Sequence, residues 1–182
     1  MTITEQKAAQ RKAGIAARRA LSDTERTRSN AALCARIMAL DCFKKAENIL
    51  LYAAFGGEAD LSALAVEAAR QGKTLAYPVC GEGFSLTAAV PGPDGWEVGA
   101  YGIRTPILSR SEILRPDQLD LVLVPCTAFD AVCRRVGWAW ARATTTATCP
   151  GAGTPWRWAW PLRPSGWIKR QWTPMTKNWT DS

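Results

Sequence analysis

The chain has 182 residues, a formal net charge of +7 and no histidine. Its length suits one domain with a sizeable hydrophobic core. The lack of histidine excludes His-based acid–base catalysis, Ser-His and Cys-His nucleophile pairs, and His-ligated metal sites. The sequence has no apolar run of about 18 residues that would predict a membrane span, and its charged start lacks the apolar centre of a secretion signal. We therefore expect a cytoplasmic protein with no membrane partner.

The positive charge is unevenly distributed along the sequence. Residues 138–182 contain six basic side chains and a single acid, whereas residues 1–137 contain 17 bases and 15 acids. Eight of the nine tryptophans also follow Gly137, while no Glu, Tyr or Phe does. A folded domain does not normally change composition so sharply. We therefore treat residues 1–137 as the domain and residues 138–182 as a separate problem.

The cysteines show no pattern of a metal or disulfide framework. There is no CxxC pair, and the spacings follow no rhythm among Cys34, Cys42, Cys80, Cys126, Cys133 and Cys149. Without a secretion signal, reduced thiols are expected. No histidine or other evident base accompanies them, which favours buried or incidental thiols over nucleophiles.

Two capping boxes predict the first two helices. A hydroxyl residue followed three positions later by Glu occurs at Thr2 and again at Ser22, and this pattern marks a helix N-terminus. The first helix should run to about Leu21, with Lys7 and Arg11 on one face. The second should bury an apolar stripe that contains Leu33, Cys34, Ile37, Met38 and Asp41.

The following segments alternate between strands and a helix. Strands are expected at 49–52 and 74–77, the second ended by Pro78. Between them, a loop at 56–58 should lead to a helix that is capped by Asp60 and stopped by Gly72. Its inward side chains should be Leu61, Leu64, Ala65 and Ala68. Residues 81–106 are rich in Gly and Pro and predict a hairpin or loop.

The apolar run 121–124, ended by Pro125, predicts a buried strand. Because ligands bind beyond the carboxyl ends of such strands, the loop after it is the expected place for chemistry. The alternation predicts an α/β fold with an open, mainly parallel sheet and helices on both faces, in three Rossmann-like layers.

Residues 1–137 resemble the 5-formyltetrahydrofolate cyclo-ligase family, also called methenyltetrahydrofolate synthetases. The matching pieces, in order, are Lys7-x-x-x-Arg11, Ala20-Leu-Ser22, Tyr52 with Gly57-Glu58, 73–78, Tyr101-Gly-Ile, Val124-Pro-x-x-Ala-Phe-Asp130 and Arg135-Val-Gly137. Each piece is weak alone, but their order and spacing are specific. Thr105 departs from the family, which usually has an acid before this proline.

The resemblance implies a reaction and its binding residues. The reaction is ATP-dependent closure of 5-formyltetrahydrofolate to 5,10-methenyltetrahydrofolate, with ATP and Mg²⁺ required and a reduced folate as the small-molecule partner. The ATP contacts it implies are Lys7, Arg11, Arg134, Arg135, Val136 and Gly137. The folate contacts it implies are Glu58 and Ala53. A monomer is expected, and a nucleic-acid partner is not.

The family continues after Gly137 with a glycine-rich phosphate loop that this chain lacks. Trp has one codon and Ala codons begin with GC, so Trp138-Ala and Trp140-Ala both encode Gly when translation starts at the third base. With suitable third bases, the same frame from Trp138 gives G-M-G-A-G-Y-Y-D-R-Y-L-P, which is the family's loop. We therefore expect a truncated cyclo-ligase domain at 1–137 and an out-of-frame tail at 138–182. The magnesium-binding aspartate lies in the shifted frame, so no metal ligand is assigned.

Other interpretations remain open for these residues. Lys7 and Arg11 also fit a solvated basic helix face, and Glu58 fits a loop acid in water. The pair Arg134-Arg135 fits surface charge, and Asp130 fits a loop cap better than a catalytic role.

Two other classes of protein remain open as well. The Trp- and Arg-rich tail could stack on single-stranded nucleic acid or lie on an anionic membrane surface. In that case the chain would be a basic binding protein rather than an enzyme. A different small α/β enzyme, of the sugar-phosphate isomerase or CoA-transferase type, is suggested only by general architecture.

Overall fold

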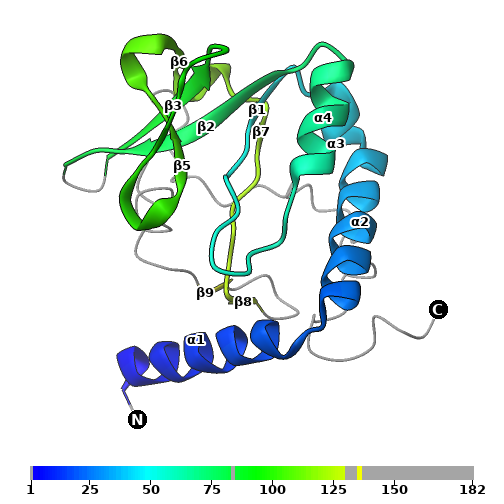
Figure 1. Ribbon diagram of the computed structural model, residues 1–182, viewed down its shortest axis with the longest axis vertical. Coiled ribbons are helices and arrows are strands. Elements are labelled where there is room, and N and C mark those ends of the chain that lie inside the picture. Colours follow the sequence, from blue (N-terminus) through cyan, green and yellow to red (C-terminus); the bar gives the residue numbers. More distant parts are fainter. Residues whose placement is uncertain (1, 83–84, 130–134, 137–182) are drawn as a thin grey trace.

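The computed structural model describes residues 2–82, 85–129 and 135–136. The tail expected to be out of frame, residues 138–182, lies outside these ranges. In the described part, the chain forms an open α/β sheet (Figure 1). Helices α2 (Asp23–Ala39), α3 (Asp41–Lys45) and α4 (Ser62–Arg70) lie beside it, and the long helix α1 (Ile3–Ala20) is set apart. No helix in that part is both long and apolar enough to cross a membrane.

Both predicted capping boxes are present and begin the first two helices. Helix α1 spans Ile3–Ala20 and helix α2 spans Asp23–Ala39. At each start the hydroxyl accepts a backbone N–H from the Glu three residues on, over 3.3 Å at Thr2 and 3.2 Å at Ser22. The Glu carboxylate accepts the backbone N–H of the hydroxyl residue in return. Two orphan donors are thus satisfied at each helix end.

The second helix ends earlier than its apolar stripe predicts. Leu40 adopts an extended conformation, with φ −70° and ψ 138°, and a separate helix α3 follows at Asp41–Lys45. This break allows Phe43, which is 1% exposed, to enter the core. The Lys73 ammonium donates to the carbonyls of Lys44 and Ala46 at the end of α3, over 3.1 and 2.6 Å. The cation therefore stabilises carbonyls that the short helix leaves unpaired.

The central sheet has the order β6-β3-β2-β1-β7 (Figure 1). Strand β1 (Asn48–Leu50) pairs in parallel with β2 (Thr74–Cys80) and β7 (Leu121–Val122). Strands β3 (Leu86–Pro91) and β6 (Ser111–Leu114) continue the sheet in antiparallel pairing. The expected open α/β sheet is confirmed, with its parallel strands on one side and an antiparallel extension on the other.

Strand β2 passes through Pro78 instead of ending before it. Strand β1 ends opposite Ala76, so β2 has already passed its parallel partner when it reaches Pro78. A proline at that position removes no hydrogen bond to β1. On its other side β2 pairs with β3, and Pro78 lies opposite Ala88. The sequence pattern could not show this change of partner, because it depends on where a different strand ends.

The hydrophobic core is divided into two clusters, one on each face of the parallel strands. Ile49, Leu51 and Leu121 belong to the cluster under α2, α3 and α4, whereas Leu50 and Val122 belong to the cluster on the opposite face. Side chains alternate between faces along a strand, which explains this division. Helix α4 (Ser62–Arg70) contributes Leu64 and Ala68, and Leu61 precedes it; the predicted inward positions are confirmed.

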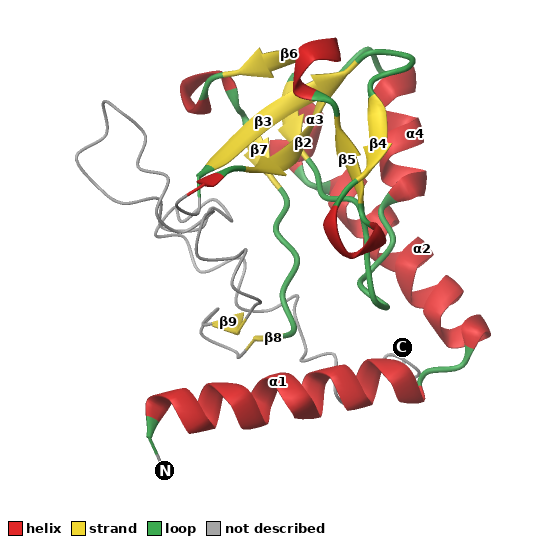
Figure 2. Cartoon of the chain, turned by 60° about the vertical axis from the view of Figure 1, so that its left-hand side comes forward, coloured by secondary structure: helices red, strands yellow, loops and turns green. Residues whose placement is uncertain are grey.

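Shorter elements complete the described chain. Strands β4 (Trp96–Val98) and β5 (Arg104–Pro106) form an antiparallel hairpin, within the segment predicted as hairpin or loop. Single 3₁₀ turns occur at η2 (Ala100–Gly102), η3 (Leu108–Arg110) and η4 (Pro116–Gln118). Strands β8 (Ala128–Phe129) and β9 (Arg135–Val136) pair with each other beside α1 (Figure 2).

Candidate functional site

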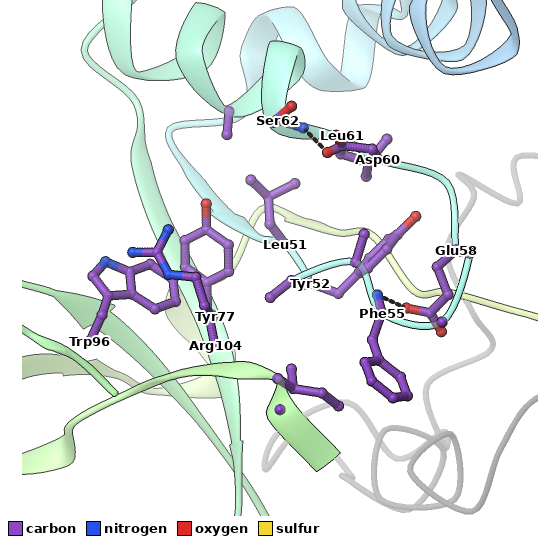
Figure 3. Close-up of a pocket in the computed structure, with 17 residues that line it drawn as sticks. Leu51, Tyr52, Phe55, Glu58, Asp60, Leu61, Ser62, Tyr77, Trp96 and Arg104 are labelled. Carbon is purple, nitrogen blue, oxygen red and sulfur yellow. Dashed lines mark hydrogen bonds between the residues drawn. The ribbon is translucent and has the colours of Figure 1, made fainter. Parts of the chain in front are cut away.

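A pocket of about 490 Å³ lies beyond the carboxyl end of β1. Its wall combines the segment 51–58 with the start of α4, Tyr77 of β2, and Trp96 and Arg104 of the β4–β5 hairpin (Figure 3). The volume is within the usual range for small-molecule sites. The sequence placed the chemistry after the strand at 121–124, but this pocket follows the neighbouring strand β1.

A tight turn presents Glu58 to the pocket. Gly56 and Gly57 have φ of 59° and 83°, values that glycine adopts without steric cost. The backbone N–H of Glu58 donates to the Phe55 carbonyl over 3.1 Å, and the Glu58 carboxylate accepts the Phe55 N–H over 3.2 Å. The two glycines therefore fold the chain back so that this carboxylate is held at the pocket wall.

The half-buried Glu58 carboxyl has an altered acidity. Burial raises its pKa, and the Phe55 N–H and the positive charge of Arg18 partly offset that rise. The neighbouring Tyr52 donates its hydroxyl to the Ala59 carbonyl over 2.9 Å, and burial also raises the Tyr52 pKa. A carboxylate held in this way can accept hydrogen bonds from the N–H donors of a heterocyclic ligand.

Aromatic rings form the wall on the other side of the pocket. Tyr77 and Trp96 meet edge to face, with centroids 4.8 Å apart and an interplanar angle of 69°. The Arg104 guanidinium lies 4.7 Å from the Trp96 ring centroid. Nearby, Tyr101 has φ of 62°, an uncommon conformation for a residue with a side chain. Flat aromatic surfaces and a cation suit a ligand that is planar in part and anionic in part.

The sequence did not single out Tyr77, Trp96 or Arg104. Antiparallel pairing sets Arg104 opposite Val98, so Arg104 and Trp96 lie on one face of the hairpin. Residues 81–106 were expected to form a hairpin or loop without a register. The one signal in the sequence that could have pointed to this wall is Trp96, the single tryptophan of residues 1–137.

The structure brings the two predicted folate contacts together. Ala53 and Glu58 both line the pocket. Lys7 and Arg11 are elsewhere, on α1, where Lys7 is exposed and Arg11 is partly buried. Helix α1 contacts the β8–β9 pair, which carries Arg135 and Val136. The other two predicted ATP contacts, Arg134 and Gly137, lie outside the described residues.

Close backbone contact positions α1 against this strand pair. The Arg18 guanidinium donates to the Cys126 carbonyl, and a Cβ added to Gly14 would lie 2.5 Å from the Thr127 carbonyl oxygen. The segment after Cys126 thus runs along α1 toward its N-terminus, in the direction of Arg11. The charge of Arg18, on the same helix, also acts on the Glu58 carboxyl at the pocket wall and partly offsets the rise in its pKa.

The described residues offer no preformed metal site. No group of three or more Cys, Asp or Glu side chains in these ranges is arranged to hold an ion. Magnesium in ATP sites is typically held by one or two carboxylates together with substrate phosphates. A site of that kind needs no cluster of three protein ligands, and the aspartate that the sequence resemblance implies for Mg²⁺ lies in the shifted frame.

Comparison with known proteins supports the assignment to a family. A sequence profile of the 5-formyltetrahydrofolate cyclo-ligase family matches residues 3–139. The 5,10-methenyltetrahydrofolate synthetase of Aquifex aeolicus is 32% identical, with a TM-score of 0.66 over 76% of this chain and 71% of that one. The corresponding enzyme of Mycoplasma pneumoniae is 17% identical, with a TM-score of 0.61 over 79% and 80% of the two chains, which shows the shared fold. No curated protein sequence matches significantly. The chain belongs to the 5-formyltetrahydrofolate cyclo-ligase family.

Proposed function

We propose that this chain binds 5-formyltetrahydrofolate in the pocket beyond β1 and ATP between α1 and the β8–β9 pair. The reaction is the family's ATP-dependent closure to 5,10-methenyltetrahydrofolate, with ADP and phosphate as the other products. The observation that carries the proposal is the shared placement of Ala53 and Glu58 in one pocket of a chain that belongs to this family.

The chemistry requires an activated formyl oxygen. Transfer of the terminal phosphoryl group of ATP to that oxygen makes it a leaving group. The neighbouring amine nitrogen then attacks the formyl carbon and releases its proton, the ring closes, and the C–O bond to phosphate breaks. Phosphoryl transfer of this kind depends on cations and backbone N–H groups around the phosphates. Lys7 and Arg11, one helical turn apart on α1, are the cations proposed for this role.

We further propose that the activity of this chain is impaired. The family match ends at residue 139, at the boundary where the composition changes and where the shifted frame restores the glycine-rich loop. That loop supplies preorganised donors to the phosphates, and each such donor contributes about 2.7–4 kcal/mol of barrier reduction. Folate binding should be less affected, because the pocket residues Ala53, Glu58, Trp96 and Arg104 all precede the boundary.

Calorimetric titration of the full chain with 5-formyltetrahydrofolate tests the folate site. We expect Glu58→Gln to weaken binding about ten-fold or more, because hydrogen bonds to a charged group contribute about 1.5–3 kcal/mol. Glu97→Gln is the matched control, since Glu97 is exposed on β4 and does not line the pocket. Equal affinity of the wild-type chain and the Glu58 variant would show that this carboxylate does not bind the substrate.

A further inference from the structure

Arg104 is an exposed cation that lies over the Trp96 ring at the pocket wall. Its guanidinium lies 4.7 Å from the centroid of Trp96, and Trp96 in turn rests edge to face on Tyr77. Tyr77 packs against the main core cluster, so the core supports the side on which Trp96 rests. A flat cation on an aromatic face is held in one plane at little cost in side-chain entropy.

The stacked guanidinium keeps its hydrogen-bonding edges available. Stacking uses the face of the group, while the N–H donors point outward in its plane. Within the described ranges, the structure shows no hydrogen bond or ion pair to the Arg104 guanidinium, although it records four ion pairs among other residues. Two parallel N–H groups match the geometry of a carboxylate or phosphate. The arrangement is therefore suited to binding an anion.

Charge is divided between the two sides of the pocket. Glu58 and Asp60 come from the segment between β1 and α4, and Arg104 comes from β5 on the other side (Figure 3). A ligand that satisfies both sides has N–H donors at one end and an anionic group at the other. A reduced folate has this layout: its pterin carries the donors, and its glutamyl tail carries two carboxylates.

We propose that Arg104 is a specificity-determining residue that binds a carboxylate of the glutamyl tail while Glu58 binds the pterin. The inference rests on the proposed function and adds the orientation of the substrate in the pocket. Phosphate groups of the nucleotide have the same anionic chemistry and are the other ligand that Arg104 could contact. A test must therefore distinguish a tail carboxylate from a nucleotide phosphate.

The experiment measures binding by the full chain to three ligands: 5-formyltetrahydrofolate, its tail-free analogue 5-formyltetrahydropteroate, and ATP. Arg104→Gln should weaken binding of the tail-bearing substrate about ten-fold, because it removes a charge-assisted hydrogen bond. The same variant should leave the affinities for the tail-free analogue and for ATP unchanged. Arg104→Lys should restore part of the loss, since it retains the charge without the planar fork.

Arg110→Gln is the matched control, because Arg110 is exposed just after the hairpin and lies outside the pocket. It should bind all three ligands like the wild-type chain. If Arg104→Gln weakened binding of both folates equally, the role of Arg104 would be to support Trp96. That result would overturn the inference but not the proposed function. A loss confined to ATP would overturn the inference in favour of a nucleotide contact. A folded wild-type chain that binds neither folate would overturn the proposed function, and the inference with it.

Discussion

Glu58 shows how a single side chain is prepared for binding at some expense in stability. Burial is the main reason that its pKa lies above the ordinary value of 4.5. The folded state therefore holds the proton more tightly than the unfolded state does. Between the unfolded and folded pKa values the native protein binds more protons, so the free energy of unfolding decreases as pH rises through this window. Above the folded pKa, the ionised carboxylate reduces stability at the place where the ligand requires it.

Replacing Glu58 by Gln should remove this pH-dependent loss. The amide oxygen can still accept the Phe55 N–H, but it carries no charge to desolvate. Relative to wild type, we expect the variant to gain stability as pH rises from about 4 to 7, across the ordinary range of carboxyl titration. Urea unfolding at both ends of that range measures the difference. A stability gap between the two proteins that does not vary with pH would contradict the assigned pKa direction.

Single residues also mark the limit of prediction from sequence. The capping boxes at Thr2 and Ser22 were predictable because all the interacting groups lie within four residues. Glu58 was found through the family resemblance, since a loop acid in water would have the same local sequence. Arg104 was missed because its place over Trp96 depends on the register of the hairpin, which no local pattern specifies.

At the scale of elements, α1 is a helix whose position depends on one small residue. Arg11, Gly14, Ile15 and Arg18 are partly buried and share one face, while most of the helix is exposed. Gly14 permits the approach of Thr127, whose carbonyl oxygen would lie 2.5 Å from an added Cβ. This contact helps to hold α1, the helix that carries Lys7 and Arg11, against the strand pair that carries Arg135 and Val136.

The substitution Gly14→Ala distinguishes two opposing effects, a gain in helix propensity and a loss in the docking of the helix. In an isolated helix this change should stabilise by about 1 kcal/mol. Here the added methyl meets backbone, and we expect it to cost about 1–3 kcal/mol in the docking of α1. Limited trypsin digestion within α1 should become about ten-fold faster, because 1.4 kcal/mol corresponds to a factor of ten in the open population.

Ala16→Ser is the control for the digestion, because Ala16 is exposed on the same helix. Its cleavage rate should stay close to that of the wild-type chain. If trypsin cleaved α1 of the Gly14→Ala variant no faster than α1 of the wild-type chain, the helix could not be docked on the segment at Thr127 in solution.

The predicted elements were correct where the signal lies in neighbouring residues. Their boundaries differ from the prediction where contacts with distant parts of the chain determine them. The strand expected at 49–52 ends at Leu50 in the ladder, although the N–H of Leu51 still donates to the Ala76 carbonyl over 2.9 Å. The helix expected to include Asp41 divides at Leu40, because Phe43 is buried by a change of direction. Neither periodicity nor capping encodes such a choice, which depends on what the core can accommodate.

At the scale of the whole molecule, Arg18 links the proposed folate pocket to the proposed ATP site. In Figure 1 the segment between β1 and α4 extends toward α1 and the β8–β9 pair. Arg18 connects them, since it donates to the Cys126 carbonyl and its charge acts on Glu58. The lining residues of the proposed folate pocket named above are described, whereas Gly137, at the start of the proposed phosphate loop, lies outside the described residues.

We propose that this member of the cyclo-ligase family has lost most of its catalysis because its phosphate loop is encoded in another frame. The decisive measurement is ATP-dependent methenyl formation by this chain and by a version in which the residues after Gly137 follow the shifted frame. We expect the restored protein to be active and the present chain to have a kcat at least about a thousand-fold lower, since more than one donor to the phosphates is lost. Comparable turnover by the two proteins would contradict the account.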